Sequence, residues 1–310
     1  MLGLSRGSWL PGWVACAPQG EQAAFALVQP SADGKPSVAW VASEPWGQPI
    51  RALQQMRRSR SLHRHRSVAL LQRAQYQCMT LDAPADLPRE QWPAAVRWQI
   101  KDSVDFPVDT AAVDVLAVPA GTSYRAQQQL IAVAAPQALV QPLVEQAQDA
   151  DAPWQAIDVA ETALRNLSAL TEPTDRAQAL LHCGPSHATL VVTYAGELLS
   201  TRQMELALLR PDDADPTDRQ HAFDQAGLEL QRTLDGIERA FGQVTLARLL
   251  ITPMPGVQAL CDHLSPLLYV PVQPLQLEDV LDFSAVPQLL ADPALLNRSL
   301  CAIGAALRAD

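Results

Sequence analysis

The side chains that could take part in chemistry are few and widely spaced in this sequence. His182 and Cys183 set a base beside a nucleophile, but neighbouring residues of a strand point to opposite faces of a sheet. Asp212, Asp213 and Asp215 carry the oxygen ligands that a divalent cation prefers, although a solvated acidic loop is the better interpretation. The residue types and their spacing therefore predict no catalytic residue and no metal site.

Other catalytic arrangements find little support. Lys35 and Lys101 are the only lysines, which leaves Schiff-base chemistry almost no candidate. No phosphate-binding GxxxxGK loop ending in Ser or Thr occurs. His63 and His65 flank Arg64 with no cysteine or carboxylate close in sequence, so we interpret them as a solvated basic turn.

Composition limits the class of protein. The 310 residues are 48% apolar and 18% charged, which is typical of a soluble globular chain. A net charge of −10 argues against a nucleic-acid partner, because such binding depends on an excess of basic groups. The five cysteines form no CxxC pair, and we expect them to be buried thiols in a reducing compartment. We see no targeting signal and no membrane-spanning stretch.

Strand patterns followed by helix patterns recur in both halves of the chain. The predicted strands are 13–17, 23–29, 38–43, 68–71, 76–81, 112–118, 130–134, 154–159, 179–183, 189–194, 197–204, 248–251 and 269–272. The predicted helices are 51–66 with its exit loop, 89–102, 137–148, one closing near 170, 218–241, 257–264 and 294–308. This order predicts an α/β protein with two similar lobes, hinged near 172–175.

The stretch 51–66 holds six arginines and two histidines and no acid. One interpretation is a solvated helix and its exit loop. The other is a basic patch that meets an acidic partner or an anionic lipid surface. Its members would be Arg57, Arg58, Arg60, Arg64 and Arg66.

One block of the sequence resembles a known family. Residues 76–119 (YQCMTLDAPADLPREQWPAAVRWQIKDSVDFPVDTAAVDVLAVP) are similar to the central block of the MshI family of MSHA-pilus biogenesis proteins, relatives of the type IV pilus protein PilM. Residues 163–167, 230–235 and 302–308 fit the same family in the same order. The resemblance extends over most of the chain from residue 68 onward and is weaker before it.

The resemblance implies an actin-like (ribonuclease H-like) two-lobed fold with a small inserted α+β subdomain. In this sequence, residues 1–72 would form the first part of lobe I and 73–150 the inserted subdomain. Residues 151–175 would return to the core and supply the hinge, and 176–310 would form lobe II.

The resemblance also implies a partner. PilM-like proteins are cytoplasmic scaffolds that lie peripheral to the inner membrane. They bind the N-terminal cytoplasmic peptide of a bitopic PilN- or MshJ-like protein. An assembly ATPase is a further expected partner. The expected contact residues lie around the end of the helix in the inserted subdomain: Arg97, Trp98, Asp105, Phe106 and Pro107. The alternative for Trp98 and Phe106 is a place in the subdomain core.

Actin-like proteins bind ATP and magnesium through glycine-rich hairpins that also carry aspartates. Here Gly3, Ser5, Gly184 and Gly256 would contact a nucleotide, but no aspartate accompanies the first pair and His182 stands where the second is expected. We therefore expect a degenerate site, no ATP hydrolysis and no cofactor, with ATP and magnesium disfavoured. The alternatives are an active actin-like ATPase and a GspL-like component of type II secretion.

Overall fold

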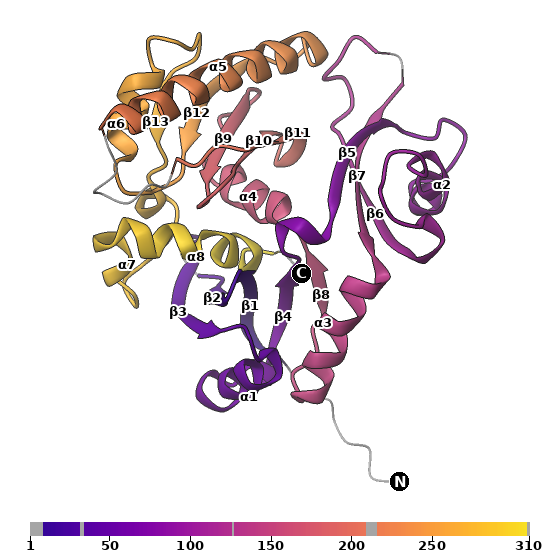
Figure 1. Cartoon of the computed structure of the whole chain (residues 1–310), viewed down its shortest axis with the longest axis vertical. Coiled ribbons are helices and arrows are strands. Elements are labelled where there is room, and N and C mark those ends of the chain that lie inside the picture. The colour runs from indigo at the N-terminus through magenta and orange to yellow at the C-terminus, as the bar shows by residue number, and fades with distance from the viewer. Residues whose placement is uncertain (1–8, 32–33, 126, 209–215, 309–310) are drawn as a thin grey trace.

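The computed structural model describes residues 9–31, 34–125, 127–208 and 216–308. Its first sheet has the order β3-β2-β1-β4-β8, with the first three strands antiparallel and the last two parallel to β1 (Figure 1). The strands are β1 (Leu10–Gln19), β2 (Gln22–Gln29), β3 (Ser37–Pro45), β4 (His65–Leu70) and β8 (Ala156–Asp158). This sheet is the framework of lobe I.

The second sheet repeats the same topology in the other half of the chain. Its order is β11-β10-β9-β12-β13, again a three-stranded antiparallel meander followed by two parallel strands. The strands are β9 (Ala177–Cys183), β10 (Ala188–Tyr194), β11 (Glu197–Met204), β12 (Leu246–Ile251) and β13 (Val272–Pro274). The matching topologies confirm the predicted pair of similar lobes.

A third, smaller sheet stands beside lobe I and has the order β5-β7-β6. It consists of β5 (Gln77–Asp82), β6 (Ala111–Ala117) and β7 (Gln129–Pro136), and helix α2 (Trp92–Gln99) packs on one face. Trp92, Val96 and Ile100 are buried there against Leu130 and Ala132. The small sheet therefore has a hydrophobic core of its own.

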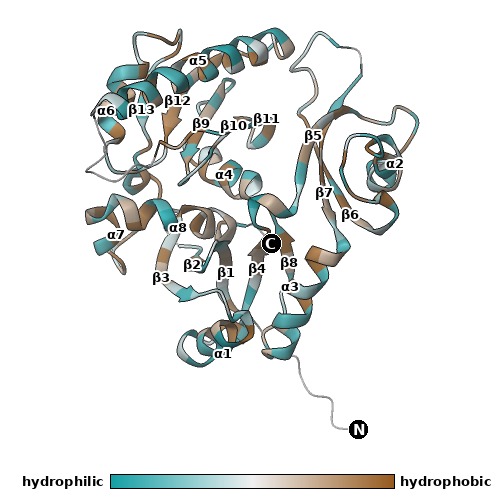
Figure 2. Ribbon diagram, viewed as in Figure 1, coloured by the Kyte–Doolittle hydropathy of each residue, from teal (hydrophilic) through white to brown (hydrophobic). Residues whose placement is uncertain are grey.

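Helices cover the outer faces of the two large sheets. They are α1 (Pro49–Arg60), α3 (Gln137–Asp149), α5 (Pro216–Ala240) and α6 (Val257–Leu264). The short α7 (Gln288–Ala291) instead packs against the helix that follows it in the chain. Figure 2 shows hydrophobic residues concentrated on the strands, with hydrophilic residues frequent along α1 and α5. Although α3 falls within the predicted inserted subdomain, its Leu143 and Ala147 join the core of lobe I, which contains Phe25 and Leu53.

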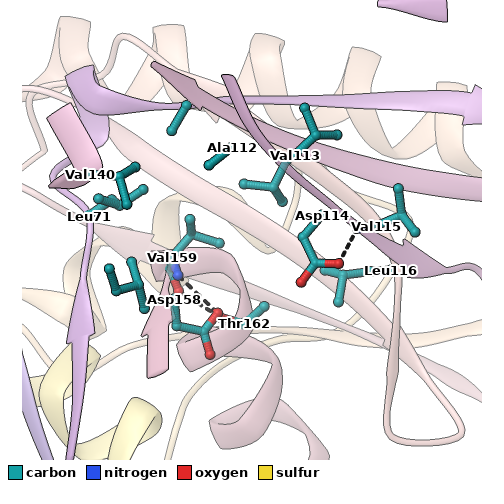
Figure 3. Close-up of a pocket in the computed structure, with 13 residues that line it drawn as sticks. Leu71, Ala112, Val113, Asp114, Val115, Leu116, Val140, Asp158, Val159 and Thr162 are labelled. Carbon is teal, nitrogen blue, oxygen red and sulfur yellow. Dashed lines mark hydrogen bonds between the residues drawn. The ribbon is translucent and has the colours of Figure 1, made fainter. Parts of the chain in front are cut away.

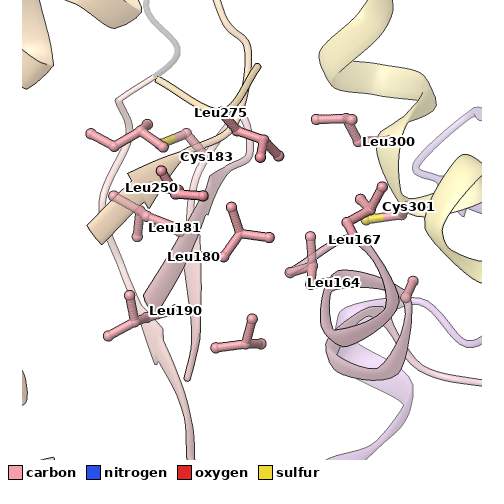
Figure 4. Packing of buried hydrophobic residues seen from close by; sticks show 14 of the residues in the cluster. Leu164, Leu167, Leu180, Leu181, Cys183, Leu190, Leu250, Leu275, Leu300 and Cys301 are labelled. Atoms are coloured by element: carbon pink, nitrogen blue, oxygen red, sulfur yellow. The ribbon is translucent and has the colours of Figure 1, made fainter. Parts of the chain in front are cut away.

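Two helices lie between the lobes. Helix α4 (Ala160–Ala169) follows a strand of lobe I but packs on β9–β11, whereas α8 (Pro293–Ala306) follows lobe II but packs on β1 and β2. The two helices also pack against each other, and their leucines meet those of β9 in one continuous core (Figure 4). The chain thus crosses between the lobes twice, and α4 and α8 hold them together.

Several predicted elements have different bounds in the structure, among them the following three. The predicted helix 51–66 ends at Arg60, because Ser61 adopts a left-handed backbone (φ 54°) and β4 begins at His65. The predicted helix 89–102 shortens to α2, with a 3₁₀ turn before it at Arg89–Gln91. The predicted strand 269–272 is instead β13 (Val272–Pro274), since proline at 271 has no N–H to donate to the sheet.

The cysteines behave as predicted. All five are free thiols; Cys16, Cys183, Cys261 and Cys301 are buried and Cys78 is half-buried. Burial raises the pKa of the Cys183 thiol to about 12, so this sulfur stays protonated and unreactive at neutral pH. Within the described ranges, no helix is long and apolar enough to span a membrane, and no group of three or more His, Cys, Asp or Glu residues could hold a metal ion.

Candidate functional site

A pocket of about 180 Å³ lies between the small sheet and lobe I (Figure 3). Its walls come from β6, β7, α3, the end of β8 and the first turn of α4. The lining residues are Leu71, Ala112, Val113, Asp114, Val115, Leu116, Val133, Ala135, Val140, Ile157, Asp158, Val159 and Thr162. Most of them are aliphatic, so the pocket is suited to an apolar side chain.

Strand alternation explains why this face of the small sheet is open. On β7, Leu130, Ala132 and Ala134 belong to the core beneath α2, whereas Val133 and Ala135 line the pocket. Successive residues of a strand point to opposite faces, so α2 and the pocket lie on opposite sides of the same sheet. One face is covered by a helix and the other is left to the pocket.

The pocket is also flanked by the edges of two sheets. Among the described strands, β6 pairs only with β7, and β8 pairs only with β4. The backbone N–H of Val115 donates to Asp114 Oδ1 at 2.8 Å, so this amide points away from β7. Since alternate residues of an edge strand share that orientation, Val113 presents its backbone groups on the same side. An extended peptide could pair with this edge.

Two carboxylates line the pocket and differ in their bonding. Asp158 accepts from the Val159 N–H at 3.0 Å and from the Thr162 hydroxyl, and its other oxygen accepts from Arg308 Nη1 at 2.9 Å. Asp114 is exposed, and among the described residues its side chain is bonded only to the N–H of its neighbour Val115. A cationic group on a bound chain would therefore meet its opposite charge at Asp114.

A polar cluster is centred on buried Glu161, which precedes the pocket residue Thr162 in α4. Tyr76 Oη donates to Glu161 Oε2 at 2.6 Å, and Gln203 Nε2 donates to Glu161 Oε1 at 2.7 Å. Arg73 donates to the Tyr76 carbonyl at 3.0 Å and lies over its ring. Burial, followed by the charge of Glu161, raises the pKa of Tyr76 well above its usual value, so its hydroxyl remains a donor. The cluster links the start of the small sheet, α4 of lobe I and β11 of lobe II.

The turn between β9 and β10 offers little to a phosphate. The Gly184 N–H already donates to the His187 carbonyl at 2.8 Å, and Pro185 has no N–H. His182 Nδ1 lies 3.2 Å from Thr252 Oγ1. Burial and the neighbouring His187 lower the pKa of His182 to about 4, so its ring is neutral at pH 7. The turn itself contains no aspartate, lysine or arginine, although burial and then the charge of the nearby Arg73 lower the pKa of His187.

The equivalent turn of lobe I was missed by sequence reasoning. Gly3 and Ser5 lie outside the described residues, and the structural counterpart of the β9–β10 turn is the one between β1 and β2, at Gly20 and Glu21. The sequence shows the β1–β2 turn as an ordinary Gly turn. Only the repeated sheet topology reveals that this turn is equivalent to the β9–β10 turn. Gly256, with φ 74°, begins helix α6 and lies in a separate loop after β12.

The buried histidine gives a prediction about acid stability. The pKa of His182 is about 4 when folded against 6.5 for the free side chain, so its contribution is present above pH 6.5 and is lost as the pH falls toward 4. Acidification should cost about 2 kcal/mol of stability at this residue, allowing for the part of the ring that water reaches. Denaturant unfolding of His182→Gln between pH 7 and pH 4 should show a smaller loss than the parent protein. The exposed His221→Gln is the control, and equal losses in both variants would contradict the assignment.

The five predicted partner-contact residues lie on the α2 side of the small sheet. Trp98 is 62% exposed, so it is not a core residue, whereas Phe106 is half-buried against the core beneath α2. Arg97 Nη1 donates to the Asp109 carbonyl at 3.4 Å, and Asp105 accepts from Gln77 at 2.9 Å. Neither these residues nor Pro107, which is exposed, line the pocket. Their contact with a partner stays a prediction.

No protein-family model and no curated protein matches the sequence. Solved structures do share its fold. A chain of a PilM-PilN type IV pilus biogenesis complex has a TM-score of 0.72 and 19% identity, over 96% of this chain and 99% of that one. A Bacteroides thetaiotaomicron protein with an actin-like ATPase fold and unknown function has a TM-score of 0.51 and 11% identity, over 94% and 99%.

A third structure, the cytoplasmic domain of EpsL, an inner membrane component of the type II secretion system of Vibrio cholerae, has a TM-score of 0.51 and 11% identity, over 96% of this chain and 95% of that one. Together these likenesses establish an actin-like ATPase fold for this chain and confirm the predicted fold class.

Proposed function

We propose that this chain is a cytoplasmic scaffold of a type IV pilus assembly platform of the MSHA kind, peripheral to the inner membrane. In this role it binds the N-terminal cytoplasmic tail of a PilN- or MshJ-like membrane protein. The observation that carries the proposal is the apolar pocket flanked by the free edges of β6 and β8. The likeness of nearly the whole chain to a member of a PilM-PilN complex supports it.

The geometry suggests how such a tail would bind. An extended segment would add to the edge of β6 through the backbone groups of Val113 and the carbonyl of Val115, whose N–H is already bonded to Asp114. Such backbone pairing supplies affinity without sequence preference. One side chain would enter the pocket, whose volume of about 180 Å³ exceeds the roughly 150 Å³ that holds a benzene-sized group. A lysine, arginine or terminal amine of the tail would approach Asp114.

We further propose that the scaffold works without hydrolysing ATP. The support is the neutral ring of His182, the internally bonded Gly184 N–H and the proline that follows it. A polyanionic nucleotide with magnesium needs charge-assisted contacts, each worth about 1.5–3 kcal/mol. An active ATPase remains the competing function, and the type II secretion assignment has the lower TM-score of 0.51 behind it.

The test is a calorimetric titration of the full chain with a synthetic peptide of a candidate partner's N-terminal tail. We expect micromolar affinity, and at least tenfold weaker binding to Leu116→Glu, which puts a charge into the apolar pocket. The matched variant is Trp98→Glu, on the α2 side of the small sheet, which should bind normally. If Trp98→Glu loses the peptide and Leu116→Glu keeps it, the α2 side is the binding surface and the pocket is not.

A parallel titration with Mg-ATP separates the two functions. We expect no heat up to millimolar nucleotide. Micromolar binding of ATP would contradict the proposal of a degenerate site and restore the motor or nucleotide switch. Thermal denaturation of each variant checks that a loss of binding is not a loss of folding.

A further inference from the structure

The charge of this protein is unevenly distributed along the chain. Residues 45–81 contain seven arginines and no aspartate or glutamate. The remaining 16 Lys and Arg face all 33 Asp and Glu, which leaves a charge of −17 on the rest of the chain. One stretch is therefore strongly basic within an acidic protein.

Helix α1 and the 3₁₀ turn after it (Leu62–Arg64) turn this stretch into a surface. Ala52, Leu53, Met56 and Leu62 are buried against lobe I, and this fixes which face of the helix is outward. The exposed basic residues are Arg51, Arg58, Arg60, His63 and Arg64, which we call the basic pole. Figure 1 shows α1 at the end of lobe I away from lobe II, beside α3.

Two of the five arginines predicted for a basic patch interact with other side chains of the protein. Arg57 is half-buried and lies 3.9 Å from Asp151, and Arg66 lies over the Trp13 ring together with Arg308. Arg60 also has an aromatic contact, over Trp40, yet it remains exposed. The outward positive charge therefore comes from the basic pole rather than from the whole run.

Acidic residues stand near the basic pole, but the basic side chains remain exposed. Exposed Glu145 and Asp149 stand on α3, which packs beside α1, and half-buried Glu44 stands on β3. Helix α1 itself carries no acid, and its last turn holds three arginines, where positive charge also complements the helix dipole.

The chemistry of the basic pole is better suited to the phosphate groups of a lipid surface than to a protein or nucleic-acid partner. Its one large exposed apolar residue is Ile50, at 37%, whereas a protein interface needs buried apolar or aromatic anchors. It carries no exposed Phe, Tyr or Trp, the side chains that stack best on nucleic-acid bases. Arginine pairs with phosphate through two parallel hydrogen bonds, and clusters of four to eight basic residues on a helix are typical of anionic-lipid binding.

We propose that the basic pole binds the headgroups of anionic phospholipids. The inference goes beyond the proposed function, because no residue of the basic pole lines the pocket. Each arginine near an anionic surface strengthens binding about fivefold, so reversing three charges should abolish it. Binding should also weaken as salt screens the charges.

The test is co-sedimentation of the full chain with vesicles of phosphatidylcholine containing about one third phosphatidylglycerol, against phosphatidylcholine alone. The parent protein should bind only the anionic vesicles, and Arg58→Glu/Arg60→Glu/Arg64→Glu should bind more than about 100-fold more weakly. The matched control is Arg219→Glu/Arg232→Glu/Arg239→Glu on α5, which changes the net charge equally and should bind normally. The corresponding glutamine triple in the basic pole should bind about 100-fold more weakly. It tests the proposal if the glutamate triple fails to fold.

Three results would overturn the proposal. The first is equal binding to neutral and anionic vesicles. The second is an equal loss in the α5 triple, which would make net charge the cause. The third is binding to duplex DNA as tight as to the anionic vesicles at the same salt concentration, which would make the basic pole a general polyanion site. Affinity for the partner peptide should be unchanged in every variant, so failure here is distinguishable from failure of the scaffold function.

Discussion

Replacing Gly304 with alanine is expected to lower the free energy of unfolding by about 3 kcal/mol. Gly304 is buried in α8, and a Cβ there would lie 2.3 Å from the carbonyl oxygen of Ala163 in α4. The Cβ would be fixed directly to the backbone of α8 and the oxygen belongs to the backbone of α4, so neither can move without separating the two helices that join the lobes. The Asn166 side chain, which donates to the Gly304 carbonyl at 2.9 Å, would be displaced as well.

Gly236 supplies the matched control for this substitution. It lies in the exposed part of helix α5, and a Cβ there would meet nothing within 4 Å. Gly236→Ala should stabilise the protein by about 0.5–1 kcal/mol, the ordinary gain from alanine in a helix. Urea unfolding measures both variants. If Gly304→Ala is neutral or stabilising, then α4 and α8 do not pack as closely as the structure has them.

Replacing Glu161 with alanine should cost about 2–4 kcal/mol, because one buried and one half-buried donor would lose their acceptor. Those donors are Tyr76 Oη and Gln203 Nε2, and both Tyr76 and Glu161 are at most 2% exposed. Glu161→Gln should cost less, about 1–2 kcal/mol, since its amide oxygen can still accept one hydrogen bond. Chemical denaturation gives each value.

A double-mutant cycle isolates the bond between Tyr76 and Glu161. Tyr76→Phe alone should cost about 1–2 kcal/mol, and markedly less in the Glu161→Ala background, where the hydroxyl has already lost its acceptor. Glu145→Ala, on the exposed side of α3, should change stability by no more than about 0.5 kcal/mol. Additive effects of the two substitutions would mean that the hydrogen bond contributes nothing to the junction between the lobes.

The local pattern of the sequence was sufficient for most of the framework. Alternating and continuous apolar runs predict strands close to where β1, β2, β10 and β11 lie, because strand formation follows the side-chain period of two. The same patterns predict the two similar lobes. The predicted bounds of an element were wrong where a local backbone conformation ends it, as at Ser61, whose left-handed backbone terminates α1.

The candidate site was much less accessible to sequence reasoning. Trp98 and Phe106 stand out as large aromatics beside a proline stop, but the pocket is on the other face of the small sheet. Its lining is ordinary alanine, valine and leucine, residues that carry no motif. What makes them a site is that β6 and β8 each lack a second neighbour among the described strands.

The sequence by itself determined the element types, the two-lobed α/β class, the buried free thiols and the basic run, because each depends on residues close together in the chain. Only the tertiary structure decided the pocket between two sheet edges, the contact of Gly304 with Ala163 and the bonds from Tyr76 and Gln203 to Glu161. These features join residues that are far apart in sequence. Their distances are set by how sheets and helices pack, and no local pattern encodes them.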